Sequence, residues 1–237
     1  MMTEQPLIAL DYVSKSFTLH LRGGLELAVV SDVSLRVAAG ECVVLGGPSG
    51  AGKSSILKMI YGNYRADHGR ILIRDGEEVV DVASAEPRRI LALRRDVMGY
   101  VSQFLRVIPR VATLDIVANA ARESGIGQEE AMERARRLLS LLNVPARLWQ
   151  LPPSTFSGGE QQRVNIARGL AADRPVLLLD EPTASLDAKN RAVVVDLIHE
   201  KKRAGTAILG IFHDEDVREA VADRIEDVTR FASSRAA

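Results

Sequence analysis

The run Gly47-Pro48-Ser49-Gly50-Ala51-Gly52-Lys53-Ser54 is the most informative segment of this chain. It fits the pattern G-x-x-x-x-G-K-[ST], and it lies between a predicted strand over Glu41–Gly46 and a predicted helix. Glycines let the backbone wrap closely, so that several N–H groups point at phosphate oxygens, and the helix adds its positive N-terminal end. Lys53 supplies a charge for the β- and γ-phosphates, and the Ser54 hydroxyl is a ligand for Mg²⁺. The segment therefore predicts a nucleoside triphosphate site, and we expect the Lys53 charge to be exposed while the loop is empty.

A second segment supplies carboxylates for the same site. Val176-Leu177-Leu178-Leu179-Asp180-Glu181-Pro182 predicts a buried strand followed by two acids, and α/β sheets bind ligands at the carboxyl ends of their strands. Asp180 suits the Mg²⁺ side of the site, and Glu181 suits polarising an attacking water as a general base. Taken alone, the pair is equally consistent with a helix N-cap. Beside the glycine-rich loop, we interpret it as part of the phosphate site.

A third segment, Phe156-Ser157-Gly158-Gly159-Glu160-Gln161-Gln162-Arg163, predicts a second anion site. Ser157 is expected to cap a helix, and the two glycines leave the first amides of that helix open to a ligand. One nucleotide does not need two such helix ends from one subunit. We therefore expect the second site to serve a nucleotide that is held by another subunit.

Apolar runs and helical spacing alternate in the second half of the chain. Strands are predicted over 176–179 and 206–212, and helices over about 158–172 and about 188–203. Unbroken apolar strands between amphipathic helices indicate a parallel sheet that is covered on both faces. The pattern is typical of an α/β core.

The first half adds shorter strands and a helical insertion. Strands are predicted over Leu7–Val13 and Asp32–Val37, and segments 71–74 and 79–82 are expected to pair as a hairpin. Apolar residues at helical spacing predict two helices after Thr113, the expected N-cap. No linker rich in Gly, Ser or Pro divides the chain, so we expect one domain with the helices inserted into it.

The composition argues against nucleic acid and membrane insertion. The 237 residues carry 31 Lys and Arg and 31 Asp and Glu, so the formal charge is zero, whereas duplex-binding proteins usually carry a basic excess. The aromatic content of 4% is low for a protein that stacks single-stranded bases. The N-terminus lacks the pattern of a secretion signal, no apolar run is long enough to span a bilayer, and the single cysteine, Cys42, suits a reducing compartment. We expect a cytoplasmic protein.

Together the three motif segments resemble the ATP-binding-cassette (ABC) ATPase family, in order and spacing, over essentially the whole chain. The resemblance implies an α/β fold: a P-loop NTPase (RecA-like) parallel-sheet core, an N-terminal antiparallel β subdomain and an inserted α-helical subdomain over about 104–156. It implies a single ATP-binding domain over residues 1–237 that hydrolyses ATP, with ATP and Mg²⁺ as cofactors. It also implies a head-to-tail dimer with a second ABC subunit, identical or paralogous, which closes on ATP and reopens on hydrolysis.

The resemblance also assigns residues beyond those that the chemistry suggests. Gln103 would contact Mg²⁺ and sense the γ-phosphate, and His213 would sense the γ-phosphate. The loop Ser185-Leu186-Asp187 would cross the dimer interface, and Phe17, with Tyr12 as the alternative, would stack on adenine. The implied catalytic residues are Glu181, His213 and Gln103, and the implied metal ligands are Ser54, Gln103 and Asp180. The implied nucleotide contacts are Gly47, Pro48, Ser49, Gly50, Ala51, Gly52, Lys53, Ser54, Ser55, Phe17, Ser157, Gly158, Gly159, Glu160 and Asp187.

Two residues depart from the common family pattern. Glu160 stands where many members carry glutamine, and Phe156 replaces a common leucine. An extra carboxylate favours the start of a helix but disfavours an approaching γ-phosphate. The contacts expected from Ser157 and Gly159 use a hydroxyl and a backbone amide, so they should survive the change.

Three further segments resemble a narrower group, the L-type ABC subunits of bacterial carbon–phosphorus lyase systems. They are SQFLRVIPR over 102–110, RLWQLPPSTF over 147–156 and GIFHDEDV over 210–217. This resemblance implies a soluble assembly for phosphonate catabolism, in which a ribose 1-phosphonate 5-triphosphate synthase acts and soluble lyase core subunits are the partners. It implies no transfer chemistry on residues of the ABC subunit itself.

Two other functions remain open from the sequence. The chain could be the ATP-binding subunit of an ABC membrane transporter, whose helical insertion would hold a coupling helix of a membrane protein. It could also be an ATP-gated clamp with negligible turnover. Glu181 argues against the clamp, because a protein that does not hydrolyse ATP can dispense with a general base.

Overall fold

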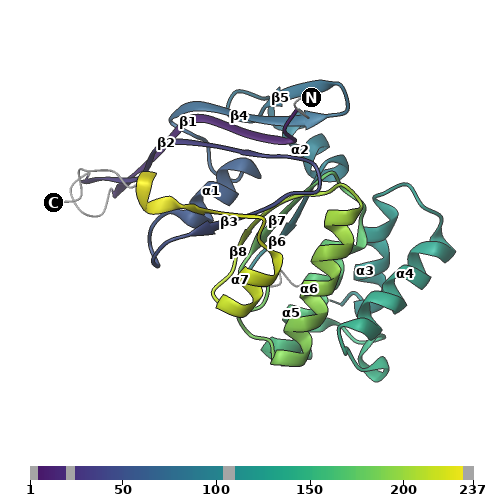
Figure 1. Cartoon of the computed structure of the whole chain (residues 1–237). Coiled ribbons are helices and arrows are strands. Elements are labelled where there is room, and N and C mark those ends of the chain that lie inside the picture. Colours follow the sequence, from purple (N-terminus) through teal and green to yellow (C-terminus); the bar gives the residue numbers. More distant parts are fainter. Residues whose placement is uncertain (1–4, 20–24, 104–109, 232–237) are drawn as a thin grey trace.

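The computed structural model describes residues 5–19, 25–103 and 110–231, and its strands form two sheets (Figure 1). The first is antiparallel with the strand order β2-β1-β4-β5. Its strands are β1 (Ile8–Leu19), β2 (Leu25–Val37), β4 (His68–Asp75) and β5 (Glu78–Asp81). The second is parallel with the order β6-β7-β8-β3-β9. Its strands are β3 (Cys42–Gly46), β6 (Met98–Val101), β7 (Val176–Asp180), β8 (Ala207–Ile211) and β9 (Arg224–Asp227).

The parallel sheet separates two hydrophobic cores because successive side chains of a strand point to opposite faces. In β7, Leu177 and Leu179 belong to one core, whereas Val176 and Leu178 belong to the other. All five residues of β7 are buried, and so are all five of β8. This double burial explains the unbroken apolar runs in the sequence.

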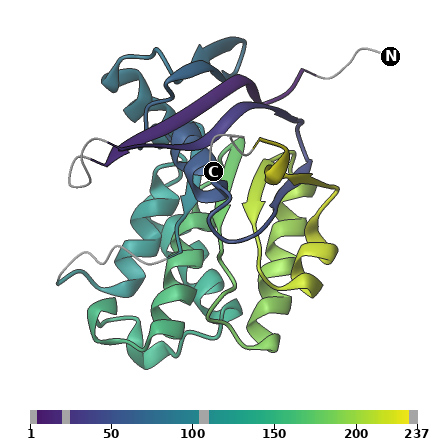
Figure 2. The same cartoon turned by 90° about the vertical axis from the view of Figure 1, so that its left-hand side faces the viewer.

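The two faces are covered differently (Figures 1 and 2). On one face lie the antiparallel sheet, α1 (Lys53–Ile60), which sits between the two sheets, and α2 (Pro87–Asp96). The other face carries α3 (Thr113–Arg122), α4 (Gln128–Leu141), α5 (Gly158–Ala171), α6 (Ala188–Arg203) and α7 (Glu215–Val221). Short 3-10 turns complete the described part of the chain: η2 (Ala146–Leu148), η3 (Pro153–Thr155) and η4 (Val228–Phe231).

Most predicted elements are confirmed, and two differ. β1 and β2 are longer than predicted, because the two strands continue to pair beyond Val13 and before Asp32, for example Lys15 with Val30 and Phe17 with Leu27. The hairpin of β4 and β5 is confirmed, with Asp75 paired to Glu78. The helical insertion contains α3 and α4, and residues 104–109 at its expected start lie outside the described residues.

The prediction that Thr113 caps α3 is wrong. The N-cap is Ala112, and Thr113 is the first helical residue, with its hydroxyl fully buried. Its backbone N–H and its hydroxyl both donate to the carbonyl of Leu151, at 3.0 and 2.8 Å. The hydroxyl therefore ties the start of α3 to the segment before α5, which a local cap pattern cannot reveal.

The packing of α4 predicts the effect of one truncation. Leu139 is fully buried against α3 and α5, so Leu139→Ala leaves a cavity and should lower the free energy of unfolding by about 2–5 kcal/mol. Leu141, two residues further on, is 40% exposed, and Leu141→Ala should stay within about 0.5 kcal/mol of the wild type. Urea unfolding measures both. Equal losses in the two variants would contradict this description of the helical insertion.

Candidate active site

The loop between β3 and α1 has a conformation that only glycine adopts easily. Gly47, Gly50 and Gly52 have φ values of 120°, 82° and 91°, in a region that other residues rarely enter. A Cβ on Gly52 would lie 2.6 Å from a methyl carbon of Val30 in β2. The loop thus lies against the antiparallel sheet, and the first amides of α1 open into it.

Lys53 spans this loop from the first turn of α1. Its ammonium donates to the carbonyl oxygens of Gly47 and Pro48, both at 2.7 Å, and the residue is only 9% exposed. The expectation of an exposed charge in the empty loop is therefore wrong, because the loop carbonyls take up the ammonium. The neighbouring Ser55, also an expected nucleotide contact, lies in the same first turn.

Ser54 meets Asp180 across the sheet. The Ser54 hydroxyl donates to Asp180 Oδ1 at 2.9 Å, and the Tyr100 hydroxyl donates to Asp180 Oδ2 at 2.9 Å. Burial, followed by the charge of Asp180, raises the pKa of Tyr100, so Tyr100 stays protonated and is the donor. A hydroxyl and a carboxylate are hard oxygen ligands of the kind that Mg²⁺ takes together with substrate phosphates and waters. These residues fit the expected metal. Among the described residues, no group of three or more His, Cys, Asp or Glu is placed to hold a metal ion.

The carboxylate of Glu181 contacts both Gln103 and His213, the residues that the resemblance assigns to the γ-phosphate. Its Oε2 accepts from Gln103 Nε2 at 3.0 Å, and its Oε1 lies 2.8 Å from His213 Nε2. The His213 side chain is 55% exposed, whereas that of Glu181 is 15% exposed. The carboxylate is therefore fixed from two sides at the edge of the site, which is what a general base needs.

The backbone of Glu181 is strained. Its φ is +53°, which is uncommon for a residue with a side chain, and its N–H donates to the carbonyl of Ile211 in β8 at 3.0 Å. Backbone strain of this kind persists where the surrounding structure over-determines the conformation, and it clusters at active sites. The residue with this backbone conformation is the one whose side chain contacts Gln103 and His213.

The capped start of α5 is confirmed at Ser157. The Ser157 hydroxyl and backbone N–H both donate to Glu160 Oε2, at 2.7 and 2.9 Å, and the Glu160 N–H donates back to the hydroxyl. These hydrogen bonds lower the pKa of Glu160. A Cβ on Gly158 would meet nothing within 4 Å. The first turn of α5 is therefore open to solvent and carries a charged carboxylate.

Two buried polar residues of α5 connect this helix to the rest of the site. Gln162 donates to the carbonyl of Pro182, directly after Glu181, at 3.0 Å. Asn165 donates to the carbonyl of Ser102, directly before Gln103, at 2.6 Å. Sequence reasoning missed both residues, since their partners are far away in the chain. Their signal is polarity on an otherwise apolar helix face.

Asp187 is the N-cap of α6. Its carboxylate accepts from the backbone N–H and the side-chain amide of Asn190, at 2.8 and 2.9 Å, and the backbone bond lowers its pKa. The loop before it is fixed by Thr183, whose hydroxyl donates to Asp214 at 2.9 Å. Asp187 thus has a structural role in the single chain. Its expected nucleotide contact stays a prediction.

The two candidate aromatic residues for adenine differ in surroundings. Phe17 is half-buried and packs edge-on against Tyr64, with ring centroids 5.2 Å apart. Tyr12 is 71% exposed. Gly52 lies against Val30, which pairs with Lys15, two residues from Phe17. Which of the two aromatic residues stacks on adenine stays a prediction.

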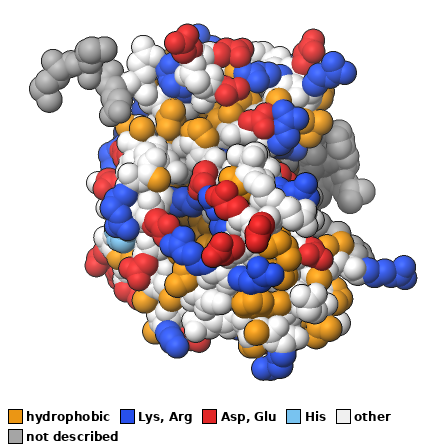
Figure 3. Space-filling view, turned by 90° about the vertical axis from the view of Figure 1, so that its right-hand side faces the viewer, with side chains coloured by type: hydrophobic (Ala, Val, Ile, Leu, Met, Phe, Trp, Pro, Cys, Tyr) orange, Lys and Arg blue, Asp and Glu red, His pale blue; other side chains and the backbone are white. Residues whose placement is uncertain are grey.

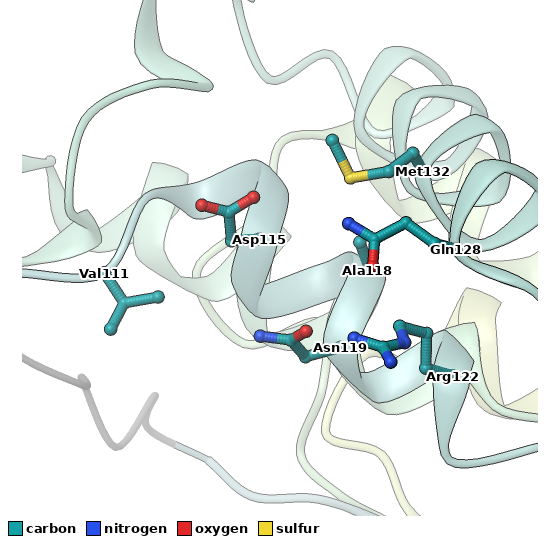
Figure 4. A pocket seen from close by; sticks show the side chains of 7 residues that line it. All are labelled: Val111, Asp115, Ala118, Asn119, Arg122, Gln128 and Met132. Atoms are coloured by element: carbon teal, nitrogen blue, oxygen red, sulfur yellow. The ribbon is translucent and has the colours of Figure 1, made fainter.

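A cleft of about 800 Å³ is lined in part by Asp180, and a smaller hollow of about 270 Å³ lies on the helical insertion. The cleft is bordered by α1, α2, α3 and α5, and the candidate site residues that line it are Ser54, Tyr100, Gln103 and Asp180. The hollow lies between α3 and α4, and it contains none of the residues expected to bind phosphate (Figure 4). On the side of the molecule where α3 and α4 lie, acidic and basic side chains are intermixed (Figure 3). Of the two, only the larger cleft is lined by Ser54 and Asp180, two of the residues expected to bind Mg²⁺.

The chain is similar in sequence to a known protein family and to curated members of it. Residues 30–184 match the family model described as ABC transporter. Fe(3+) ions import ATP-binding protein FbpC 1 of Rhizobium meliloti (strain 1021) is 40% identical over 197 residues, which are 83% of this chain and 53% of that protein. The macrolide export ATP-binding/permease protein MacB of Marinobacter nauticus is 34% identical over 231 residues, which are 94% of this chain and 34% of that protein. The chain thus spans about half the length of the first of these curated relatives, and less of the second.

Solved structures agree with the fold. The dimeric post-hydrolysis state of the ATP-binding cassette MJ0796 bound to ADP and Pi superposes with a TM-score of 0.81 at 27% identity, covering 94% of this chain and 95% of that one. The expected α/β P-loop NTPase architecture is confirmed. Neither curated relative named above is a lyase subunit. None of the described helices is both long and apolar enough to cross a membrane.

The arrangement of Glu181 predicts how its amide variant behaves. Glu181→Gln keeps the size of the side chain and one acceptor oxygen for Gln103 or His213 but cannot take a proton, so ATP hydrolysis should fall by about 10²-fold or more while ATP affinity is retained. Phosphate release and equilibrium nucleotide binding measure the two quantities. Glu219→Gln, on the exposed face of α7, is the matched control. A Glu181→Gln protein that turns over ATP at the control rate would refute the role of this carboxylate.

Proposed function

This chain belongs to the ABC transporter family of ATP-binding proteins, and from that membership we propose that it hydrolyses ATP as a head-to-tail dimer whose closure moves a partner assembly. The observation that carries the proposal is the division of the site. One chain offers a phosphate loop with Lys53, Ser54 and Asp180, and separately an open helix start at Ser157. In the described part of the chain, the Ser157 side chain bonds only to Glu160. No contact outside its own helix start therefore occupies the Ser157 hydroxyl, and a nucleotide on a second subunit would compete only with Glu160 for it.

The residues of one chain divide the work in the proposed dimer. Amides of the loop and the Lys53 ammonium would bind the phosphates, while the Ser157 hydroxyl and the Gly159 amide of the facing subunit would bind the γ-phosphate. Ser54 and Asp180 would hold Mg²⁺, which neutralises charge on the phosphates. Glu181 would orient and deprotonate the attacking water, with Gln103 and His213 fixing its carboxylate. Only the closed dimer makes both sets of contacts, so ATP favours closure and loss of the γ-phosphate reopens it.

Mixing two inactive variants tests the shared site. In a mixture of Lys53→Ala and Ser157→Arg subunits, the mixed dimer has one site with both defects and one with neither, so hydrolysis should partly return. The matched control mixes Lys53→Ala with Glu181→Gln. Both of those defects lie on the loop side of the site, so every mixed dimer keeps two damaged sites and should stay inactive. Restoration in the control, or none in the test mixture, would contradict a dimer of identical subunits with shared sites.

The comparisons favour a membrane permease as the partner. One relative is named as an ATP-binding protein for Fe(3+) import, and another as an ATP-binding/permease protein for macrolide export. On this basis the first candidate is the ATP-binding component of an ABC membrane transporter. The cleft between α2 and the helical insertion would then receive the coupling segment of the permease. Because ATP is supplied there, the proposal places the chain in the cytoplasm.

The carbon–phosphorus lyase assembly is the second candidate, and the resemblance of segments 102–110, 147–156 and 210–217 favours it. Segment 147–156 has a defined task in the fold. The carbonyls of Trp149 and Leu151 accept the N–H groups of Leu114 and Thr113, so this segment fixes the start of α3. A distinctive sequence there shapes the helical insertion, the surface that a partner would contact. In this candidate the partners are soluble lyase core subunits that act in phosphonate catabolism.

Purification from cells separates the two candidates. Tagged Glu181→Gln protein, held closed with Mg-ATP, is isolated from phosphonate-grown cells with and without detergent, and growth on an alkylphosphonate is compared with that of a Lys53→Ala strain. A transporter component should bring down an integral membrane protein only with detergent, and the Lys53→Ala strain should grow normally. A lyase component should bring down soluble proteins without detergent, and the Lys53→Ala strain should fail to grow.

A further inference from the structure

Asp180 is held by two hydroxyl groups, and only one of them comes from an expected metal ligand. Ser54 donates to Oδ1, and Ser54 is itself expected to bind Mg²⁺. Tyr100 donates to Oδ2 from the neighbouring strand β6, at 2.9 Å. We propose that Tyr100 is a positioning residue of the Mg²⁺ site, which fixes the Asp180 carboxylate for the metal without touching metal or nucleotide. The inference deepens the proposed function and rests on it.

The geometry gives the Tyr100 hydroxyl a specific task. Asp180 is 5% exposed, so water gives its carboxylate little support. A buried carboxylate oxygen without a donor is costly, and a carboxylate with one free oxygen turns to find one. With Tyr100 on Oδ2, the carboxylate keeps the rotation that directs Oδ1 toward Ser54 and the phosphate loop. The Tyr100 hydroxyl would therefore hold Asp180 in the orientation that binds the metal.

Tyr100 is itself held in place. Its ring stacks on the ring of Tyr61 at the end of α1, with centroids 4.9 Å apart and planes inclined by 24°. The guanidinium of Arg94 in α2 lies over the Tyr61 ring, 4.6 Å from its centroid, and Arg94 Nε donates to the Tyr61 carbonyl at 2.8 Å. The chain of contacts Arg94–Tyr61–Tyr100–Asp180 fixes the hydroxyl from outside the metal site. A hydroxyl that served only solubility would not be clamped in this way.

The test compares three variants by how strongly Mg²⁺ tightens nucleotide binding. Calorimetric titration with the non-hydrolysable analogue AMP-PNP, in EDTA and in saturating Mg²⁺, gives two Kd values, and their ratio is the Mg²⁺ coupling. Tyr100→Phe keeps the ring stack and removes only the hydroxyl. It should lower the coupling roughly tenfold, the size expected for one hydrogen bond to a charged group, while Kd in EDTA stays unchanged. Mn²⁺ paramagnetic resonance of the complex gives a second readout that is independent of turnover.

Tyr61 supplies the matched controls. Tyr61→Phe also removes one tyrosine hydroxyl but keeps the stack, so its coupling should equal that of the wild type. Tyr61→Ala removes the stack and should lower the coupling part of the way toward Tyr100→Phe. In an Asp180→Asn background, Tyr100→Phe should have no further effect on the coupling, because Tyr100 acts through that carboxylate.

Two results would overturn the proposal. One is a Tyr100→Phe coupling equal to that of Tyr61→Phe. The other is a Tyr100→Phe protein whose Kd rises equally in EDTA and in Mg²⁺, which would mark a packing role. Failure of the proposed function gives a different signature, since the wild-type protein itself would then bind AMP-PNP without any dependence on Mg²⁺.

Discussion

The hydrogen bond between Ser54 and Asp180 joins residues that are 126 positions apart, and it depends on the order of the parallel sheet. β3 and β7 are separated by β8, so the two residues meet across a neighbouring strand. Parallel strands end at the same edge of the sheet, and the phosphate loop and the carboxylates leave the sheet at that edge. Burial of both faces of β7 and β8 fixes this register, because a shift by one residue would exchange the two hydrophobic cores. The two hydrophobic cores on the faces of the sheet thus fix the strand register that brings Ser54 and Asp180 together.

Local patterns in the sequence were sufficient for the parts of this site that are contiguous in the chain. The glycine loop, the strand that ends in Asp180 and the capped helix at Ser157 all have the predicted conformations. The partners of individual polar side chains could not be predicted in the same way. Lys53 proved to be buried on its own loop, and Thr113 proved to bond to Leu151. In both cases a polar group was satisfied by a carbonyl that no spacing rule identifies.

The resemblance to a family predicted which residues gather at the site but not how they hold each other. Gln103 and His213 were expected to sense the γ-phosphate, and in the structure both lie on the carboxylate of Glu181. The two residues that the resemblance assigns to the γ-phosphate are thus in direct contact with the proposed general base. Gln162 and Asn165 extend this connection, because they bond α5 to the backbone directly after Glu181 and directly before Gln103. The helix that begins at Ser157 is therefore hydrogen-bonded directly to the two segments that carry Glu181 and Gln103.

Glu160 shows how one residue serves the single chain and opposes the closed dimer. In the single chain its carboxylate completes the capping box with Ser157, and it lies at the positive end of α5, where negative charge is favourable. In the proposed dimer a triphosphate approaches the same helix end, and like charges repel. The approaching phosphate also competes with Glu160 for the Ser157 hydroxyl. In the proposed dimer, the capping box of Ser157 and Glu160 would therefore oppose closure, and the favourable free energy of closure would come from the phosphate loop, Lys53 and the metal ligands of the other subunit.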